Sequence, residues 1–269
     1  MEQNAVFVFD LDGVITNPAD SSVDIVAVQH IYTLLAGGAY VAINTGRSYN
    51  WVKTNLLDNF RQLGGDAPFD HLYIVCEKGG ESLIWNGNDF YPQPSRFALP
   101  TEAMELCKQV FDANAAQLGT MFWDATKRTL VTIEKFPEAS LEQFHQQQAL
   151  LAEQLNKAFV GQNIRVDCTT IAVDVELPAA GKHAGAELIY DWLAHQPGIQ
   201  KTKQTACTCF GDSRSDYEMA RYFASRGITT VFVFVGKKDV VFDEHDDVTL
   251  VKTRALYSAG TREYFSQRN

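Results

Sequence analysis

The sequence has no apolar run long enough to cross a lipid bilayer, which requires about 20 consecutive residues. Its N-terminus lacks both the basic start and the apolar segment of a secretion signal. The five cysteines are few and odd in number for 269 residues, which argues against a framework of disulfides. We therefore expect a cytoplasmic protein that does not associate with membranes.

Positive charge is also scarce, because 23 Lys and Arg residues stand against 33 Asp and Glu residues and leave a formal net charge of -10. An acidic protein repels nucleic acid and anionic lipid, so we expect neither as a partner. The chain contains no internal repeat and no low-complexity segment. Its hydrophobic content of 46% suffices for one large domain or two modest ones. Composition leaves open whether the protein is a monomer or a dimer.

The most informative segment lies near the N-terminus. Residues Ala5 to Phe9 are continuously apolar, as in a strand buried on both faces of a parallel sheet, and Asp10-Leu11-Asp12-Gly13 follows. Open α/β sheets bind ligands at such strand ends. In an extended segment Asp10 and Asp12 point the same way, and two like charges this close need a cation or a raised pKa. A plain Asx turn would produce the same residues, so the pair alone does not decide between a phosphoryl-transfer site and a turn.

Two further segments have polar residues where an apolar run ends and a helical pattern begins. The run Tyr40–Ile43 ends in Asn44-Thr45-Gly46-Arg47, and a hydroxyl beside a helix N-terminus suits a phosphate. The run Thr205–Phe210 ends in Gly211-Asp212-Ser213-Arg214-Ser215-Asp216. Carboxylates at Asp212 and Asp216, four residues apart on a glycine-led loop, fit ligation of a hard metal ion. Taken singly, each segment is equally well explained by helix capping.

A fourth signal is Lys182, which opens a helical pattern before the last of these runs. It offers a positive charge for a phosphate or for an aspartate pair, although a solvated lysine in a first helical turn is the plainer explanation. Arg47, beside Thr45, has three open interpretations: a contact to the phosphate, a contact to an inserted domain, or a surface salt bridge. The four signals together, three of them at strand-to-helix junctions, indicate a single site.

The order of elements predicts a doubly wound α/β sheet with an insertion. Strands and helices alternate up to Cys76 and again after Lys182, which is the pattern of a parallel sheet. Between them come a hairpin around Asn86-Gly87-Asn88 and then the order helix, two strands, helix, two strands. We therefore predict a Rossmann-like core at 1–80 and 179–269 and an inserted α+β domain at 81–178. Within the insertion we expect helices at Thr101–Gln117 and Leu141–Phe159, and strands at Met121–Trp123, Thr129–Glu134, Ile164–Cys168 and Ile171–Glu176.

On these residues the chain resembles the haloacid dehalogenase superfamily of phosphohydrolases and phosphotransferases. That superfamily has an Asp-x-Asp pair after its first strand, a Ser or Thr after its second, a Lys, and a final Gly-Asp-x-x-x-Asp. The corresponding segments here are Asp10 to Asp12, Thr45, Lys182, and Gly211 to Asp216. In the superfamily the third motif often reads Lys-Gly, whereas His183 follows Lys182 here. The inserted α+β unit resembles the cap domain of members that act on sugar phosphates and similar small metabolites.

The resemblance implies roles for these residues. Asp10 would be the nucleophile that forms an aspartyl-phosphate, and Asp12 would protonate the leaving alkoxide and then activate water. A Mg²⁺ ion would be bound by Asp10, by the backbone carbonyl of Asp12, and by Asp212 and Asp216. Thr45, Gly46 and Lys182 would bind the phosphoryl oxygens, and the cap would cover the site and contact the substrate, a small phosphate ester.

Two other functions remain open. A phosphomutase or phosphotransferase on the same scaffold would use the same residues but would keep water away from the intermediate. A non-catalytic binding module that had kept the fold is the more distant possibility, and the presence of all the acidic positions argues against it.

Overall fold

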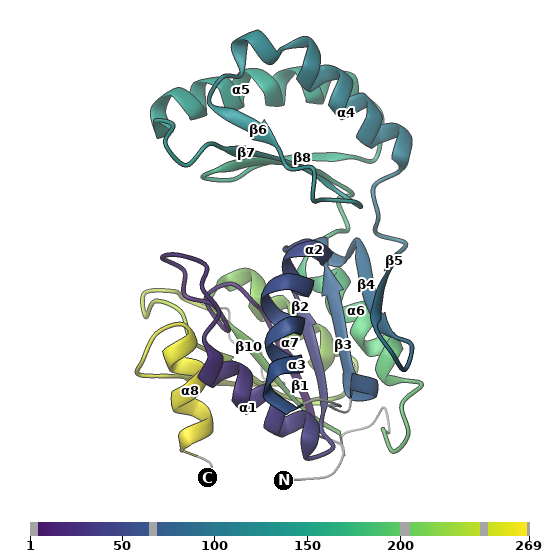
Figure 1. The fold of residues 1–269 in the computed structure, drawn as a ribbon, viewed down its shortest axis with the longest axis vertical. Coiled ribbons are helices and arrows are strands. Elements are labelled where there is room, and N and C mark those ends of the chain that lie inside the picture. The colour runs from purple at the N-terminus through teal and green to yellow at the C-terminus, as the bar shows by residue number, and fades with distance from the viewer. Residues whose placement is uncertain (1–4, 65–68, 200–204, 243–246, 268–269) are drawn as a thin grey trace. The chain divides into compact units, whose positions relative to one another are not determined.

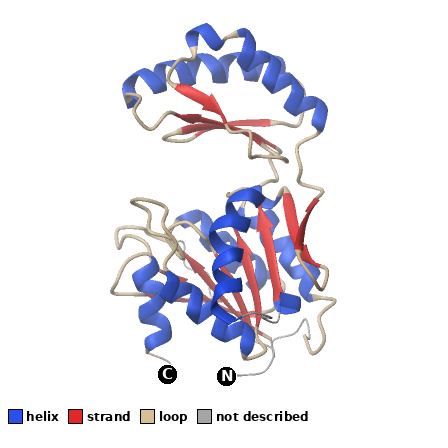
Figure 2. Cartoon of the chain, in the orientation of Figure 1, coloured by secondary structure: helices blue, strands red, loops and turns tan. Residues whose placement is uncertain are grey.

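The computed structural model describes residues 5–64, 69–199, 205–242 and 247–267 (Figures 1 and 2). Contacts divide the chain into two units, one of Met1–Gln93 with Gly181–Asn269 and one of Pro94–Ala180. None of the described helices combines the length and the apolarity needed to span a membrane.

The first unit is built on an eight-stranded sheet in the order β12-β11-β10-β1-β2-β3-β4-β5. All its pairings from β12 to β3 are parallel, which confirms the doubly wound α/β sheet. The strands are β1 (Val6–Phe9), β2 (Tyr40–Asn44), β3 (Leu72–Cys76), β4 (Glu81–Trp85), β5 (Phe90–Pro94), β10 (Ala206–Gly211), β11 (Thr229–Phe234) and β12 (Val248–Lys252). In the register of the three central strands, Phe9 lies between Ile43 and Phe210. Because these strands are parallel neighbours, their carboxyl ends meet at one edge of the sheet.

Helices cover both faces of this sheet (Figure 1). On one face lie α1 (Ile25–Ala36), α3 (Asp58–Gly64) and α8 (Ser258–Ser266), and on the other lie α6 (Lys182–Leu193) and α7 (Arg214–Ser225). Asp24 caps α1 by accepting hydrogen bonds from the amides of Val26 at 3.1 Å and Ala27 at 3.2 Å. The helical pattern that follows Arg47 in the sequence consists of α2 (Tyr49–Val52), a π-helical segment (Lys53–Leu57) and α3.

The hairpin that the sequence places at the start of the insertion belongs to the large sheet instead. Strand β4 pairs antiparallel with β3, and Leu83 and Phe90 are fully buried in the core of the first unit. The ring of Phe90 lies 5.4 Å from that of Phe69, so the hairpin is bound by packing as well as by strand pairing. The inserted unit of the structure accordingly begins at Pro94.

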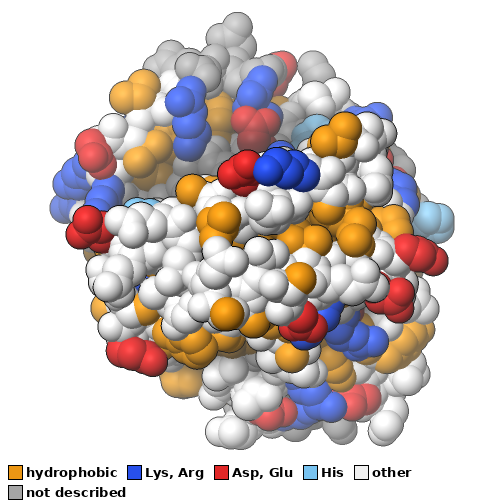
Figure 3. Space-filling model, turned by 90° about the horizontal axis from the view of Figure 1, so that it is seen from above, with side chains coloured by type: hydrophobic (Ala, Val, Ile, Leu, Met, Phe, Trp, Pro, Cys, Tyr) orange, Lys and Arg blue, Asp and Glu red, His pale blue; other side chains and the backbone are white. Residues whose placement is uncertain are grey.

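The second unit has an α+β architecture, and its sheet consists of four antiparallel strands in the order β6-β7-β9-β8. Its elements are α4 (Thr101–Ala113), β6 (Met121–Trp123), β7 (Val131–Lys135), α5 (Leu141–Ala158), β8 (Arg165–Cys168) and β9 (Ala172–Glu176), in the predicted order. The core contains Ile133, Phe144 and Val173, contributed by two strands and a helix. Charge pairs four residues apart, Lys108 with Asp112 and Lys157 with Glu153, lie on exposed helix positions. Acidic and basic side chains are interspersed over the face in Figure 3.

The helix α5 offers a matched pair of positions for testing this core. Phe144 is 0% exposed and Leu141 is 48% exposed on the same helix. We expect Phe144→Ala to lower the free energy of unfolding of the second unit by about 3–5 kcal/mol, since it leaves a cavity. Leu141→Ala should change it by no more than about 0.5 kcal/mol. Hydrogen exchange of the β7 and β9 amides measures both, and equal effects of the two substitutions would contradict the assigned core.

Candidate active site

The site lies where β1, β2 and β10 end together. Asp10 follows β1 directly, its amide donates to the carbonyl of Phe210 at 3.0 Å, and it is 6% exposed. The rings of Phe9 and Phe210, which are partners in the strand register, stack with their centroids 4.6 Å apart. After Asp10 the chain turns, because the carbonyl of Leu11 accepts from the amides of Ile15 and Thr16. The strand therefore delivers Asp10 to a buried position from which the backbone immediately turns away.

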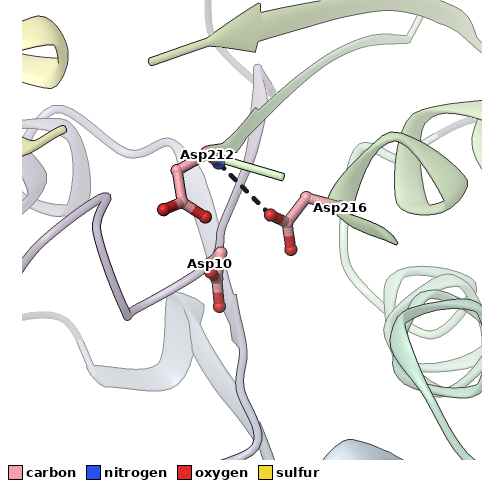
Figure 4. Close-up of side chains that lie close together, drawn as sticks. All are labelled: Asp10, Asp212 and Asp216. Atoms are coloured by element: carbon pink, nitrogen blue, oxygen red, sulfur yellow. Dashed lines mark hydrogen bonds between the residues drawn. The ribbon is translucent and has the colours of Figure 1, made fainter. Parts of the chain in front are cut away.

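Three of the four predicted acidic residues form a cluster (Figure 4). One carboxylate oxygen each of Asp10, Asp212 and Asp216 lies within 4.8 Å of the others, and these residues come from the end of β1, the loop after β10 and the first turn of α7. Asp216 is fully buried and orders this loop, because its Oδ2 accepts from the amides of Asp212 and Ser213 and from the Ser213 hydroxyl. Asp216 is thus the N3 residue of the capping box that begins α7, with Ser213 as the N-cap, as well as a member of the cluster.

Glycine is required where the motif loops approach each other. Gly13 has a φ of +72°, and a Cβ there would lie 2.3 Å from Oδ2 of Asp212. A Cβ at Gly211 would lie 2.2 Å from the Cβ of Asp216. Side chains at either position would push the carboxylates apart.

Lys182 lies among the carboxylates at the start of α6. Its Nζ donates to Oδ1 of Asp10 and to the carbonyl of Asn44 at 2.7 Å, and it is 2.9 Å from Oδ1 of Asp216. Asn44, which sequence reasoning missed as a site residue, donates from Nδ2 to the carbonyl of Lys182 at 2.9 Å. Gly185 allows this contact, since a Cβ there would lie 2.1 Å from Asn44 Oδ1. A polar residue as the last position of a fully buried strand was the available signal for Asn44.

Thr45 is completely buried at the end of β2, and its amide donates to the carbonyl of Val75 at 2.9 Å. Its Oγ1 accepts from the amide of Arg47 at 3.0 Å. Within the described residues its hydroxyl proton has no acceptor, so this group can donate to an oxygen of a ligand. Gly46 follows at a partly exposed position.

Asp12 lies outside the three-carboxylate cluster. Its side chain is 46% exposed and pairs with Arg47, whose Nη2 donates to Oδ1 at 2.7 Å. Of the three interpretations of Arg47, the structure places it in a salt bridge, and the partner is a carboxylate of the site.

Burial and like charge dominate the electrostatics of the cluster. Burial, followed by the charge of Asp216, raises the pKa of Asp10 well above its usual value, while Lys182 opposes this shift. Burial and Asp216 also raise the pKa of Asp212 to about 6. Burial alone would lower the pKa of Lys182, but the charges of Asp10 and Asp216 outweigh it and raise that pKa above its usual value.

A charge count indicates which ion the site suits. Asp10, Asp12, Asp212 and Asp216 carry four negative charges when ionised, and Lys182 and Arg47 carry two positive ones. This excess of negative charge favours a cation among the carboxylates. Carboxylate oxygens are the ligands of hard ions such as Mg²⁺, so the donor set fits that metal.

Comparison with known proteins finds the same fold. No protein-family model and no curated protein matches the sequence. Among solved structures, the C-terminal domain of trehalose-6-phosphate phosphatase from Candida albicans has a TM-score of 0.67 at 14% identity, over 98% of this chain and 92% of that chain. The sucrose-phosphatase of Synechocystis, solved with sucrose and phosphate, has a TM-score of 0.54 at 16% identity, over 99% of this chain and 98% of that one.

A third similar structure carries a different description. The C-terminal domain of a trehalose synthase regulatory protein from Candida albicans has a TM-score of 0.65 at 9% identity, over 97% of this chain and 94% of that chain. At these identities the comparisons show that the chain shares the fold of these solved structures, and they show the fold alone.

The raised pKa of Asp212 has a consequence for stability in the absence of metal. Because this pKa is about 6 when folded and 3.8 in the reference state, the folded chain holds a proton between these values that the unfolded chain has lost. The contribution of Asp212 to stability therefore falls as pH rises through this window. In a chelator, we expect thermal unfolding to show Asp212→Asn gaining stability relative to wild type between about pH 4 and pH 7.

The stabilisation by added Mg²⁺ should have the opposite pH dependence and increase as pH rises. Mg²⁺ competes with the proton on Asp212, so it should raise the melting temperature of the wild type more at about pH 7.5 than at about pH 5. The Asp212→Asn variant should respond less at either pH. Parallel pH curves for the two proteins in chelator would contradict the assignment of the raised pKa to Asp212.

Proposed function

We propose that this protein is a Mg²⁺-dependent phosphomonoester hydrolase that works through an aspartyl-phosphate and acts on a sugar phosphate or a similar small metabolite. The observation that carries this proposal is the position of Asp10. It is a buried carboxylate at the end of a central parallel strand, in contact with Lys182 and within 4.8 Å of two further carboxylates.

Asp10 has the environment that a carboxylate nucleophile needs. Burial removes the water that would otherwise solvate it and, with the charge of Asp216, raises its pKa, while the contact with Lys182 opposes this shift and favours the ionised form. An oxygen of Asp10 would form a bond to phosphorus while the bond from phosphorus to the alcohol oxygen breaks. Hydrolysis of the resulting aspartyl-phosphate would release inorganic phosphate and restore the carboxylate.

The groups around Asp10 suit the oxygens of a phosphoryl group. Lys182 supplies a positive charge, and the Thr45 hydroxyl has a proton to donate. The amides of Leu11 and Asp12, at the start of the turn after Asp10, would add donors. A metal ion would be held by Asp10, Asp212 and Asp216 with the backbone carbonyl of Asp12, and it would offset negative charge on the transferred group. Asp12 is the remaining carboxylate and would exchange a proton with the leaving alcohol and then with water.

The substrate class is inferred from two features. The chain carries an inserted α+β unit of helices over an antiparallel sheet. Two structures with the same fold along nearly their full length are named for phosphatases of trehalose 6-phosphate and of sucrose phosphate. Both features favour a phosphorylated sugar, whose leaving group is an aliphatic alcohol and needs a proton.

Asp10→Asn tests the nucleophile. The amide keeps the shape of the side chain but is a far weaker nucleophile, so turnover of an aryl phosphate in Mg²⁺ should fall by at least about 10³-fold. Asp58→Asn is the control, because Asp58 forms only a half-exposed pair with Arg61. Thermal unfolding of both variants shows whether the fold is kept. An Asp10→Asn variant with wild-type turnover would overturn the proposal.

The balance of products separates hydrolysis from phosphoryl transfer to another alcohol. For each sugar phosphate converted, a hydrolase releases one inorganic phosphate, and we expect this ratio from the wild type. A positional isomer formed without phosphate release would show a mutase. No Mg²⁺-dependent turnover across a panel of sugar phosphates, nucleotides and phosphoglycerates would favour a non-catalytic role. This is the specific alternative, because one structure with the same fold is described as a regulatory protein.

A further inference from the structure

The contact between Arg47 and Asp12 is more directional than a simple ion pair. Nη2 of Arg47 donates to Oδ1 of Asp12 at 2.7 Å, and Nε lies 3.0 Å from Oδ1 and 3.1 Å from Oδ2. Oδ1 therefore receives the stronger share of these bonds. The guanidinium fork defines both the rotation and the position of the carboxylate.

Arg47 is itself held by several segments of the first unit. Its Nη2 donates to the Ser21 hydroxyl at 3.0 Å, and its guanidinium carbon lies 5.0 Å from the centre of the Trp51 ring. Its backbone amide donates to Thr45 Oγ1, and its carbonyl accepts from the amide of Glu77. The arginine is thus a fixed support, built from the loop after β1 and from the ends of β2 and β3.

Stability alone gives little reason for this arrangement. A partly exposed ion pair contributes about 0–1 kcal/mol. The chain has such a pair elsewhere, since Arg61, 36% exposed, contacts Asp58 and Asp89 at the surface of the first unit. Arg47 differs from Arg61 in its partner, which lies two residues from Asp10.

We propose that Arg47 is a positioning residue that orients Asp12 for proton transfer to the leaving alcohol. This inference rests on the proposed function. While Arg47 holds Oδ1, the less engaged Oδ2 is the oxygen from which the proton is transferred. As the Asp10 oxygen bonds to phosphorus and the bond from phosphorus to the alcohol oxygen breaks, this proton passes to the alcohol oxygen and leaves Asp12 ionised beside Arg47.

The dependence on leaving group distinguishes this role from direct phosphate binding. A weakly basic aryl oxide departs without a proton, whereas a sugar alkoxide needs one. Loss of Asp12 orientation should therefore affect sugar phosphates far more than aryl phosphates. A phosphate-binding arginine would affect all of them alike, because the phosphoryl group is the same.

The experiment measures kcat/KM for a series of aryl phosphates and sugar phosphates, since this ratio reports only the steps up to the first phosphoryl transfer. The variants are Arg47→Met, Arg47→Lys, Asp12→Ala and the double variant, with Arg61→Met as the matched control. For sugar phosphates, Arg47→Met should lower kcat/KM by about 10²-fold, and for the best aryl leaving group by less than about threefold. Arg47→Lys, which keeps the charge without the fork, should lie between wild type and Arg47→Met.

The double variant gives an independent readout. If Arg47 acts through Asp12, Arg47→Met should cause no further loss once Asp12 is alanine. Equal losses across the leaving groups, or additive losses in the double variant, would overturn the proposal and indicate that Arg47 binds the phosphoryl group or supports the fold. Arg61→Met should match wild type throughout.

The same series separates failure of this inference from failure of the proposed function. A wild type without phosphatase activity, or an active Asp10→Asn variant, would reject the function itself. An active wild type whose Asp12→Ala variant depends on the leaving group, while Arg47→Met does not, would reject only the role of Arg47.

Discussion

The contact of Lys182 with Asp10 and Asp216 is the interaction on which the site depends. Both carboxylates are buried, with side chains 8% and 1% exposed, and the lysine that joins them is 16% exposed. Breaking a buried pair of this kind by removing one partner costs about 3–5 kcal/mol, because the remaining charge has lost its compensation. Lys182 also joins the two chain segments that form the first unit, since it comes from α6 and contacts a residue that follows β1.

The sheet order makes this contact possible. Strands β2, β1 and β10 are neighbours, although the chain segment containing the whole second unit separates β2 from β10 in the sequence. The polar groups near these strand ends depend on one another: Asp10 after β1 needs Lys182 at the start of α6, and Lys182 needs Asn44 at the end of β2 and Asp216 in the first turn of α7. Gly13 and Gly211 then allow the backbone to approach the side chains of Asp212 and Asp216, which a side chain at either glycine position would prevent. The candidate site thus depends on one parallel register, which brings the ends of three strands and the first turns of α6 and α7 together.

Much of the fold could be predicted from the sequence because its signals are local. Apolar runs bounded by polar junctions identified β1, β2 and β10, and the order of elements in the second unit followed from periodicity. The hairpin β4–β5 was recognised from its turn, but its membership of the large sheet depends on pairing with β3 and on packing against Phe69. Periodicity does not specify which strand a hairpin joins. The partner of Arg47 and the role of Asn44 were missed for the same reason, since both contacts join distant residues.

Two carboxylates one residue apart have acquired different environments, and this difference permits different chemical roles. Strand β1 ends at Phe9, so the alternation of an extended chain does not continue to Asp12. Asp10 remains buried beside a lysine, whereas Asp12 lies in the turn, half-exposed beside an arginine. A nucleophile benefits from exclusion of water, and a proton donor that must later activate water benefits from access to it. The turn after β1 therefore places the proposed nucleophile and the proposed proton donor in different environments.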